Sequence, residues 1–302
     1  FLTKLPAEYV DAEVRDMIRK LPERKNLPPE QNKGFSVPLN IFLYQEVQRM
    51  QKVISLVRKT LVDVIDAIDG IIIMTPFLLD AVNAIYDGKV PHKWLYDPSG
   101  AEISWLLMKL SAWMDSLTKR NDQLSSWLKY GRPQTFWLGG FFNPQGFLTA
   151  MKQEVTRMHK GVPVGGMPAR MADRDKEAWS LDDVVYHTVV KEHTFEQIKD
   201  PQTEGVYVRE LFLESSTWGK GGLEDPPEKK NFYPLPLLYV TAISKKKGAD
   251  TDKMSNSYSC PVYKYPRRTD KYLIFRVNLD CGTKQPSFWK LRGVALHCFT
   301  EN

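Results

Sequence analysis

The first half of the chain takes its fold from LNIFLYQEVQRMQKVISLVRKTLVDVIDAIDG, residues 39–70. Apolar residues recur there at steps of three and four, and charged or amide side chains occupy the positions between them. This spacing places the apolar residues on one face of an α-helix. The pattern therefore predicts one long amphipathic helix that ends at Gly70 and has a broad apolar face to bury.

Further helical patterns surround this long helix. A short one lies within residues 9–21, ahead of a polar connector. Later patterns predict helices over Pro76–Tyr86, Ala101–Leu117, Asn121–Tyr130 and 143–159. Ser99 and Asn143 are residue types that cap helix N-termini, and Pro144 suits the first helical position. Between the last two helices, Thr135–Phe142 combines large apolar residues with two glycines, which indicates a buried, tightly turning segment.

The periodicity becomes alternating in the second half of the chain. Short β-branched and aromatic runs are separated there by turn-forming stretches, without helical patterns between them. The runs are Val184–Val190, Val206–Leu213, Leu237–Ser244, Ser259–Tyr265, Tyr272–Leu279 and Phe288–Phe299. We therefore expect an α+β protein with an N-terminal multi-helix domain followed by a six-stranded antiparallel partial β-barrel. The expected segments are 1–36 as a lead-in and connector, 37–160 as the helical subdomain, 161–180 as a mobile loop or insertion, and 181–302 as the β-barrel subdomain.

Composition excludes several classes of protein. The 302 residues contain 42 Lys plus Arg and 36 Asp plus Glu, and a net charge of +6 is too mild for a dedicated nucleic-acid binder. The most apolar stretch, Gly70–Leu79, is far shorter than the ~20 residues of a membrane span. Three cysteines, an odd number, indicate buried free thiols in a reducing compartment: Cys260, Cys281 and Cys298. Because the chain begins at Phe1 without a charged and then apolar leader, we interpret it as a piece of a longer protein that carries no targeting segment of its own.

No catalytic, cofactor-binding or metal-binding residue is predicted. Gly219–Gly222 is the nearest approach to a phosphate loop, but no Ser or Thr follows its lysine, so a surface turn is the better interpretation. Three aspartates step by three along the long helix and continue its solvated face, unlike a calcium loop. Two histidines sit six apart without a carboxylate or thiol at ligand spacing. These residues are Asp63, Asp66, Asp69, His187 and His193.

Two features favour interaction over chemistry. The basic tip Lys245-Lys246-Lys247, continued by Lys253, is more often a solvated hairpin end than a docking site for an acidic surface. Large aromatic residues are the second feature. Most of them should be core, yet tryptophan is favoured where modules meet, so we leave open whether one lies at an interface. These aromatic residues are Trp94, Trp105, Trp113, Trp127, Trp137, Phe141 and Phe142.

Five stretches, in order and over nearly the whole chain, resemble the C-terminal segment of dynein heavy chains, the axonemal class in particular and its outer-arm members by preference. They are Pro38–Met50, Ala67–Met74, Phe136–Ala150, Cys260–Asp270 and Trp289–Leu296. The chain departs from that family at Val162–Ala178, which has the character of an insertion. It also departs at Glu210 and at Glu214-Ser215-Ser216, where relatives usually carry Gly or other small residues.

The resemblance implies a domain that lies on one face of a ring of six AAA+ modules and performs no chemistry. It implies that residues 1–36 are the tail of the sixth module and the connector out of it. The domain would brace the ring and tune how ATP hydrolysis elsewhere becomes movement along a microtubule. The implied cofactors, ATP and Mg, belong to the parent motor's AAA+ modules, and none is expected in these residues.

The implied partners are the AAA+ ring of the same heavy chain and, through the parent complex, microtubules and dynein intermediate and light chains. Neither a nucleic acid nor a membrane is expected. The implied location is the cytoplasm and cytoskeleton, in the axoneme of a cilium or flagellum. Predicted interface residues are Trp137, Phe141, Phe142, Lys245, Lys246 and Lys247. Two alternatives stay open: direct microtubule or accessory-chain binding through Lys245–Lys253, and an enzyme whose site is assembled from dispersed residues.

Overall fold

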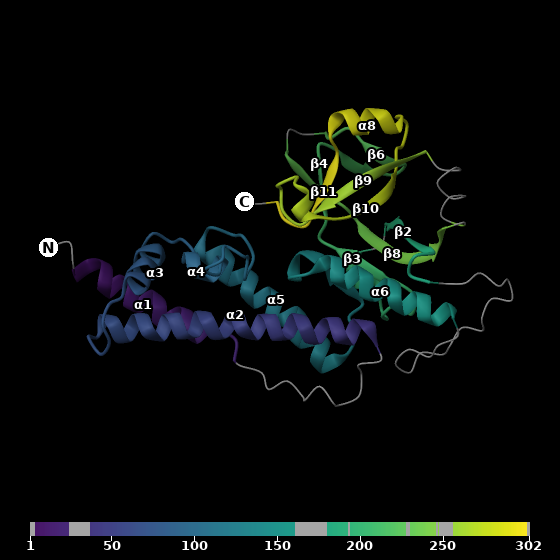
Figure 1. The fold of residues 1–302 in the computed structure, drawn as a ribbon. Coiled ribbons are helices and arrows are strands. Elements are labelled where there is room, and N and C mark those ends of the chain that lie inside the picture. The colour runs from purple at the N-terminus through teal and green to yellow at the C-terminus, as the bar shows by residue number, and fades with distance from the viewer. Residues whose placement is uncertain are drawn as a thin grey trace. The chain divides into compact units, whose positions relative to one another are not determined.

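The computed structural model describes residues 4–23, 37–160, 180–192, 194–227, 230–245, 247 and 256–300 (Figure 1). Apart from the last residue, the chain divides into two compact units. The first unit comprises Phe1–Pro29 and Tyr44–Ser125, and the second comprises Glu30–Leu43 and Ser126–Glu301. These units group the chain by packing, whereas the four predicted segments follow sequence order and stay predictions. Val162–Ala178, predicted to be a mobile loop, lies outside the described residues, as does nearly all of the connector after Glu23.

The first two helices confirm the predicted pattern. Helix α1 spans Lys4–Lys20 and α2 spans Pro38–Ile68. Most of the periodic apolar positions of α2 are buried, from Leu39 to Val64, whereas Ile65 and Ile68 near its end are partly exposed. At its end Gly70 has a φ of 74°, and the Ile71 N–H donates to the Asp66 carbonyl over 2.8 Å. Glycine is the residue that reaches this left-handed conformation without strain, so the helix ends where the sequence predicts.

Three further helices follow, and one prediction about them is wrong. Helix α3 spans Pro76–Tyr86, as predicted, α4 spans His92–Leu95, and α5 spans Leu110–Tyr130. The two helices predicted over 101–117 and 121–130 are thus one helix that begins later and continues without a break. The Asp97 carboxylate accepts hydrogen bonds from the backbone N–H groups of Ser99 and Ala101, and this local turn replaces the expected Ser99 cap.

Tryptophan side chains form the centre of the first unit. The rings of Trp105 and Trp113 stack with centroids 4.6 Å apart, and the Trp94 ring lies 5.3 Å from that of Trp113. The Arg120 guanidinium lies 4.5 Å from the centre of the Trp105 ring, and all four side chains are buried. Stacked aromatic rings with a cation on one face contribute both buried area and directional attraction.

The second unit is built around the segment that was predicted to turn tightly. Strand β1 spans Thr135–Trp137, the 3-10 turn η1 spans Leu138–Gly140, and α6 spans Pro144–His159. The Asn143 side chain accepts from the Gly146 N–H over 3.0 Å, which confirms the predicted cap.

The strands form three sheets. A four-stranded sheet has the order β1-β3-β8-β2, and in it β1 runs parallel to β3. A five-stranded sheet has the order β10-β9-β11-β4-β7, with β11 parallel to β9, and β5 pairs with β6 in a two-stranded ribbon. The bounds are β2 Val184–Lys191, β3 Val206–Arg209, β4 Phe212–Glu214, β5 Thr217–Gly219, β6 Gly222–Glu224, β7 Phe232–Pro234, β8 Leu237–Ser244, β9 Ser257–Tyr263, β10 Leu273–Asp280 and β11 Ala295–His297. Two short 3-10 turns complete the connections, η2 at Phe195–Gln197 and η3 at Asp270–Tyr272.

The α+β class is confirmed, but the six-stranded antiparallel partial barrel is not. The described strands are divided among three sheets, and two of these contain a parallel pair. The last predicted strand, Phe288–Phe299, begins inside helix α8, Pro286–Arg292, and only Ala295–His297 forms a strand, β11. Pro286 lies in the first helical turn, and Gly293 ends the helix at a φ of 68°. Proline at the start and glycine at the end are typical of a helix. Because α8 is only seven residues long, its apolar residues could not be told from those of a β-strand by periodicity.

Two non-glycine residues in this unit have left-handed backbone. Glu210 has a φ of 58° and Ser215 a φ of 65°. Both lie where the sequence departs from the small residues usual in the family it resembles. For a residue with a Cβ this conformation costs roughly 1–2 kcal/mol. The departures thus place strain in the two turns on either side of β4.

Replacing Ser215 by glycine should stabilise the chain. Relief of the left-handed strain exceeds the extra freedom that glycine gains in the unfolded state, so we expect a net gain of about 0.5–1 kcal/mol in the free energy of unfolding. Urea unfolding followed by far-UV circular dichroism measures it. Ser215→Ala keeps the Cβ and serves as the control, which should show no such gain. A less stable Ser215→Gly chain would contradict the assignment of strain.

Candidate functional site

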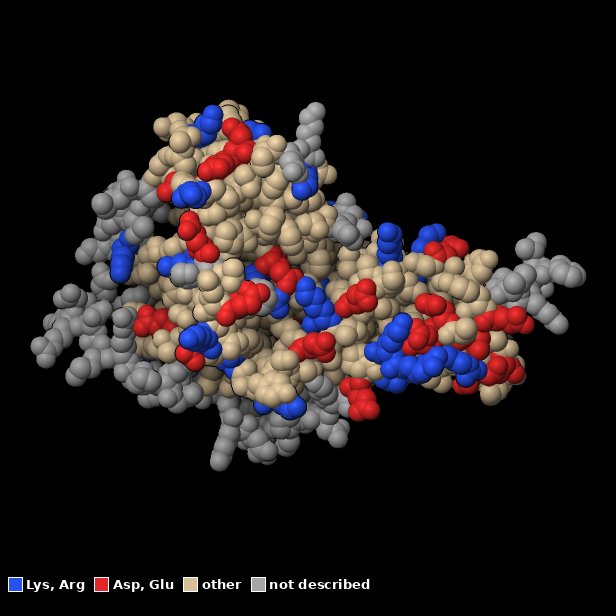
Figure 2. Space-filling view, turned by 180° about the vertical axis from the view of Figure 1, so that it is seen from behind, with Lys and Arg blue, Asp and Glu red and all other residues tan. Residues whose placement is uncertain are grey.

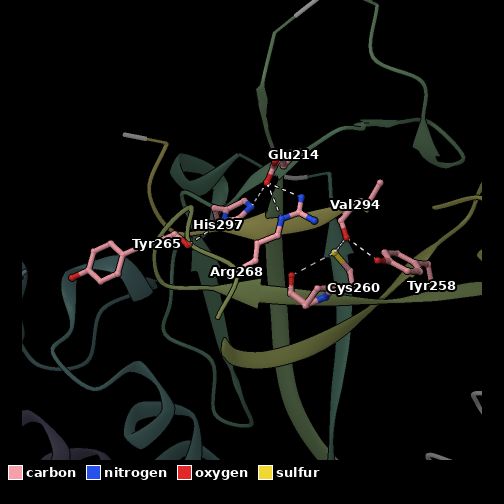
Figure 3. Close-up of polar contacts among 8 residues, drawn as sticks. Glu214, Tyr258, Cys260, Tyr265, Arg268, Val294 and His297 are labelled. Atoms are coloured by element: carbon pink, nitrogen blue, oxygen red, sulfur yellow. Dashed lines mark hydrogen bonds and ion pairs between the residues drawn. The ribbon is translucent and has the colours of Figure 1, made fainter. Parts of the chain in front are cut away.

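A partly buried cluster of charged and polar groups joins the last strand to the rest of the five-stranded sheet (Figure 3). His297 comes from β11, Glu214 from the end of β4, and Tyr265 and Arg268 from the connection between β9 and β10. The antiparallel pairing of β11 with β4 sets Ala295 opposite Glu214 and His297 opposite Phe212, so His297 lies diagonally across the strand pair from Glu214. In Figure 3 the Glu214 carboxylate points toward both the imidazole and the guanidinium.

Glu214 is the centre of this cluster. Its Oε2 lies 2.6 Å from His297 Nε2 and 2.7 Å from Arg268 Nη2. The other ring nitrogen, His297 Nδ1, lies 3.3 Å from the carbonyl oxygen of Tyr265. Since a carboxylate only accepts hydrogen bonds, Nε2 carries a proton and donates it to Glu214. One carboxylate therefore ties two distant segments of the chain together.

Burial and the neighbouring charges set the protonation of the cluster. Burial lowers the pKa of His297 below its ordinary value, and the nearby Glu214 carboxylate offsets only part of that effect. Burial alone would raise the pKa of Glu214, but the hydrogen bond and charge of Arg268, helped by His297, hold it below its ordinary value. At neutral pH Glu214 is therefore ionised and lies between Arg268 and the His297 ring.

On strand β9, the hydroxyl of Tyr258 and the thiol of Cys260 both contact a backbone carbonyl oxygen. The Tyr258 hydroxyl donates to the carbonyl oxygen of Val294 over 2.7 Å, and the Cys260 Sγ lies 3.9 Å from the same oxygen. Burial raises the pKa of the Cys260 thiol and raises the pKa of Tyr258 to about 12. Neither group can act as a nucleophile or general base near neutral pH, because each stays protonated.

The geometry of the cluster favours structure over catalysis. A histidine–carboxylate pair serves as a general base only if one ring nitrogen can reach a substrate. In His297 one nitrogen faces Glu214, the other faces Tyr265, and the ring is buried. The cluster therefore holds β11 to β4, and neither ring nitrogen of His297 is open to a substrate.

This cluster was missed by sequence reasoning. His297 and Glu214 are 83 residues apart, and no short motif connects them. The nearest signal was the unusual Glu214-Ser215-Ser216 stretch and the presence of Arg268 within one of the quoted motifs. Only the pairing of β4 with β11 brings these residues together.

The residues that were predicted to form an interface have different surroundings. Trp137 and Phe141 are buried within the second unit, and Trp137 packs edge-on against Phe299 at 5.8 Å between centroids. Phe142 is half-buried, and its carbonyl oxygen accepts from Lys264 Nζ over 2.9 Å. The side chains of Trp137 and Phe141 are therefore occupied by packing in this chain, and their role at an interface stays a prediction.

The basic tip lies largely outside the described residues. Lys245 and Lys247 follow β8 and are exposed, whereas Lys246 and residues 248–255 are not described. The Lys245 N–H donates to the Asp183 carbonyl oxygen over 2.8 Å, which fixes the backbone where the tip begins.

The other sequence candidates have the following surroundings in the structure. Gly219–Gly222 forms the turn between β5 and β6, and Asp69 lies 3.6 Å from Arg15 in an exposed ion pair. Within the part of the chain that the structure describes, no group of three His, Cys, Asp or Glu side chains could hold a metal ion. The same part contains no helix that is long and apolar enough to cross a membrane. All three cysteines are buried thiols.

Charged side chains of both signs are mixed on the helices. Figure 2 shows Lys and Arg beside Asp and Glu over the helical part of that face. On α1, Arg15 pairs with Asp11 and Lys20 with Asp16. Such exposed pairs contribute little to stability, and they reduce the net field that a polyanion would encounter.

The fold and the cluster together define an α+β domain whose aromatic and charged groups are used for packing. Comparison with known proteins then gives the family: residues 3–298 match the C-terminal domain of dynein heavy chains, and the protein belongs to that family. It is 41% identical over 299 residues to dynein axonemal heavy chain 8 of Mus musculus and 36% identical over 301 residues to the dynein gamma chain of the flagellar outer arm of Chlamydomonas reinhardtii. Each alignment covers 98% of this chain and 6% of the relative.

The Glu214–Arg268–His297 cluster should make stability fall in acid. The pKa values of His297 and Glu214 are held below their ordinary 6.5 and 4.5, so the unfolded chain binds more protons than the folded chain as pH falls. The stabilisation is present above those ordinary values and is lost as pH drops through the folded-state pKa values. His297→Gln should therefore lose less unfolding free energy than the wild type between about pH 7 and about pH 5.

Urea unfolding across that pH range measures the difference in slope. His92→Gln removes an exposed imidazole from α4, outside the cluster, and should keep the wild-type pH profile. A His297→Gln chain with the wild-type slope would show that the buried ring does not govern acid stability.

Proposed function

We propose that this chain is the non-catalytic C-terminal domain of an axonemal dynein heavy chain, which packs on the AAA+ ring and regulates ATP-driven, microtubule-based motility of a cilium or flagellum. The family match over residues 3–298 carries the proposal. The names of the relatives support the axonemal setting, since they are axonemal heavy chains and a flagellar outer-arm chain.

The proposal assigns the chemistry to other parts of the heavy chain. ATP and Mg would be bound and used by AAA+ modules, and the partners of this domain would be those modules. Microtubules and the intermediate and light chains would be reached through the whole complex, in the axoneme. The geometry supports this division because His297 and Cys260 are buried and occupied by structural contacts.

A second candidate function uses the basic tip at Lys245–Lys253. Exposed Lys245 and Lys247 favour it, because lysine attracts acidic surfaces. Co-sedimentation of the chain with microtubules at low salt tests it, and binding that vanishes in a Lys245→Glu, Lys247→Glu variant would favour direct attachment. A Lys220→Glu, Lys290→Glu variant changes the charge by the same amount at two exposed positions elsewhere and is the control.

Deleting residues 37–302 from the full heavy chain tests the first proposal. We expect basal ATP hydrolysis to stay measurable, since the catalytic modules remain, while run length or stall force changes because the ring loses its brace. Phosphate release and optical trapping of single motors measure the two quantities. A full-length motor with Lys220→Ala, at the exposed β5–β6 turn, controls for surface changes that should have no effect.

Two outcomes of the deletion would contradict the proposal. Unchanged run length and force at every load would show that the domain does not regulate movement. A motor without any hydrolysis would show that the domain is a structural necessity for the ring and not a regulator.

A further inference from the structure

The turn between α2 and α3 exposes a run of apolar side chains. Residues Ile71, Ile72, Ile73 and Met74 follow each other there, and none of them is buried. Ile71 is 70% exposed and Ile73 is 86% exposed. Scattered apolar residues on a surface are ordinary, but four consecutive ones at an exposed turn are typical of a contact site. We name this surface, Ile71–Met74, the isoleucine turn.

The backbone of the isoleucine turn is held at both ends. On the α2 side, the N–H groups of Gly70 and Ile71 donate to the carbonyl oxygens of Ala67 and Asp66, over 3.2 and 2.8 Å. On the α3 side, the Thr75 hydroxyl accepts from the Leu78 N–H over 3.3 Å and caps the helix. These two caps fix the turn before anything binds, so docking would lose little backbone entropy.

The caps also leave the apolar side chains uncovered. In the usual glycine-ended motif the residue after the glycine packs back on the helix. Ile71 occupies that position here, yet most of its surface is exposed. The backbone groups at the end of α2 are therefore hydrogen-bonded. The apolar side chains of Ile71–Met74 remain exposed among the described residues.

The surroundings of the turn are acidic. Asp69 and Asp80 flank it in sequence and are exposed, and Asp66 is half-exposed one turn earlier in α2. Arg15 of α1 lies 3.6 Å from Asp69, so three carboxylates are offset by one cation there. An acidic rim repels an anionic lipid surface and favours a protein hollow with basic residues at its edge.

We propose that the isoleucine turn is a docking surface that inserts into an apolar hollow of its own heavy chain, in a part beyond these 302 residues. This inference rests on the proposed function, which it deepens by naming the surface of contact. The matched relatives are far longer than this chain, which spans 6% of them, so such a partner region is available within one polypeptide. The turn supplies the apolar anchors, and the aspartates supply charge complementarity.

Thiol labelling in the full heavy chain tests the proposal. Ile73→Cys is compared with Leu291→Cys, since Leu291 on α8 is 90% exposed and is an equally open position. Maleimide labelling of each cysteine is followed by peptide mass spectrometry, and each rate is divided by the rate of the same variant in denaturant. We expect the Ile73→Cys rate to be at least about tenfold lower than that of Leu291→Cys, because docking excludes the reagent.

Equal rates would overturn the proposal, since the turn would then be open in the whole protein. Protection that disappears on dilution would identify a second copy as the occupant and would also overturn it. A benzophenone attached at the Ile73→Cys thiol should form a cross-link to a peptide of the same heavy chain outside these residues. A cross-link to another polypeptide would contradict the assigned partner. If the turn is unprotected while deletion of residues 37–302 still changes force, the proposed function stands and only this surface is wrong.

Discussion

The packing of the start of α2 into an aromatic cluster is the contact on which the second unit depends. The Phe42 ring lies 5.0 Å from that of Phe141 and 5.4 Å from that of Phe147, edge-on in both cases. One turn earlier, the Leu39 N–H donates to Glu154 Oε1, and the other oxygen of that buried carboxylate pairs with Arg132 over 3.0 Å. A helix N-terminus has backbone donors without partners inside the helix, and α6 supplies an acceptor for one of them. Apolar packing and a satisfied backbone thus fix the start of the longest helix.

The same use of side chains recurs elsewhere in the protein. In the first unit, Trp105 stacks on Trp113 and carries the Arg120 guanidinium on its face. In the five-stranded sheet, Glu214 holds Arg268 and His297. Residues of types that could perform chemistry are therefore occupied in holding elements together. Packing of this kind within each unit is consistent with the proposed non-catalytic role in a motor.

Sequence patterns predicted the parts of this structure that depend on local physics. The long α2, its end at Gly70, and the Asn143-capped α6 follow from periodicity and capping. The start of α5 at Leu110 instead of Ala101, its continuity to Tyr130 and the short helix α8 were missed. The Glu214–His297 pair could not be predicted, because strand pairing between distant segments brings the two residues together. The isoleucine turn was visible as an apolar stretch, but its exposure was not.

The central claim is that this protein works by packing and has no nucleotide site of its own. Isothermal titration calorimetry of the 302 residues with Mg-ATP tests it most directly. The account predicts only the heat of dilution across the titration. A saturable heat with a dissociation constant near or below ~10 μM, equivalent to about −7 kcal/mol, would contradict it.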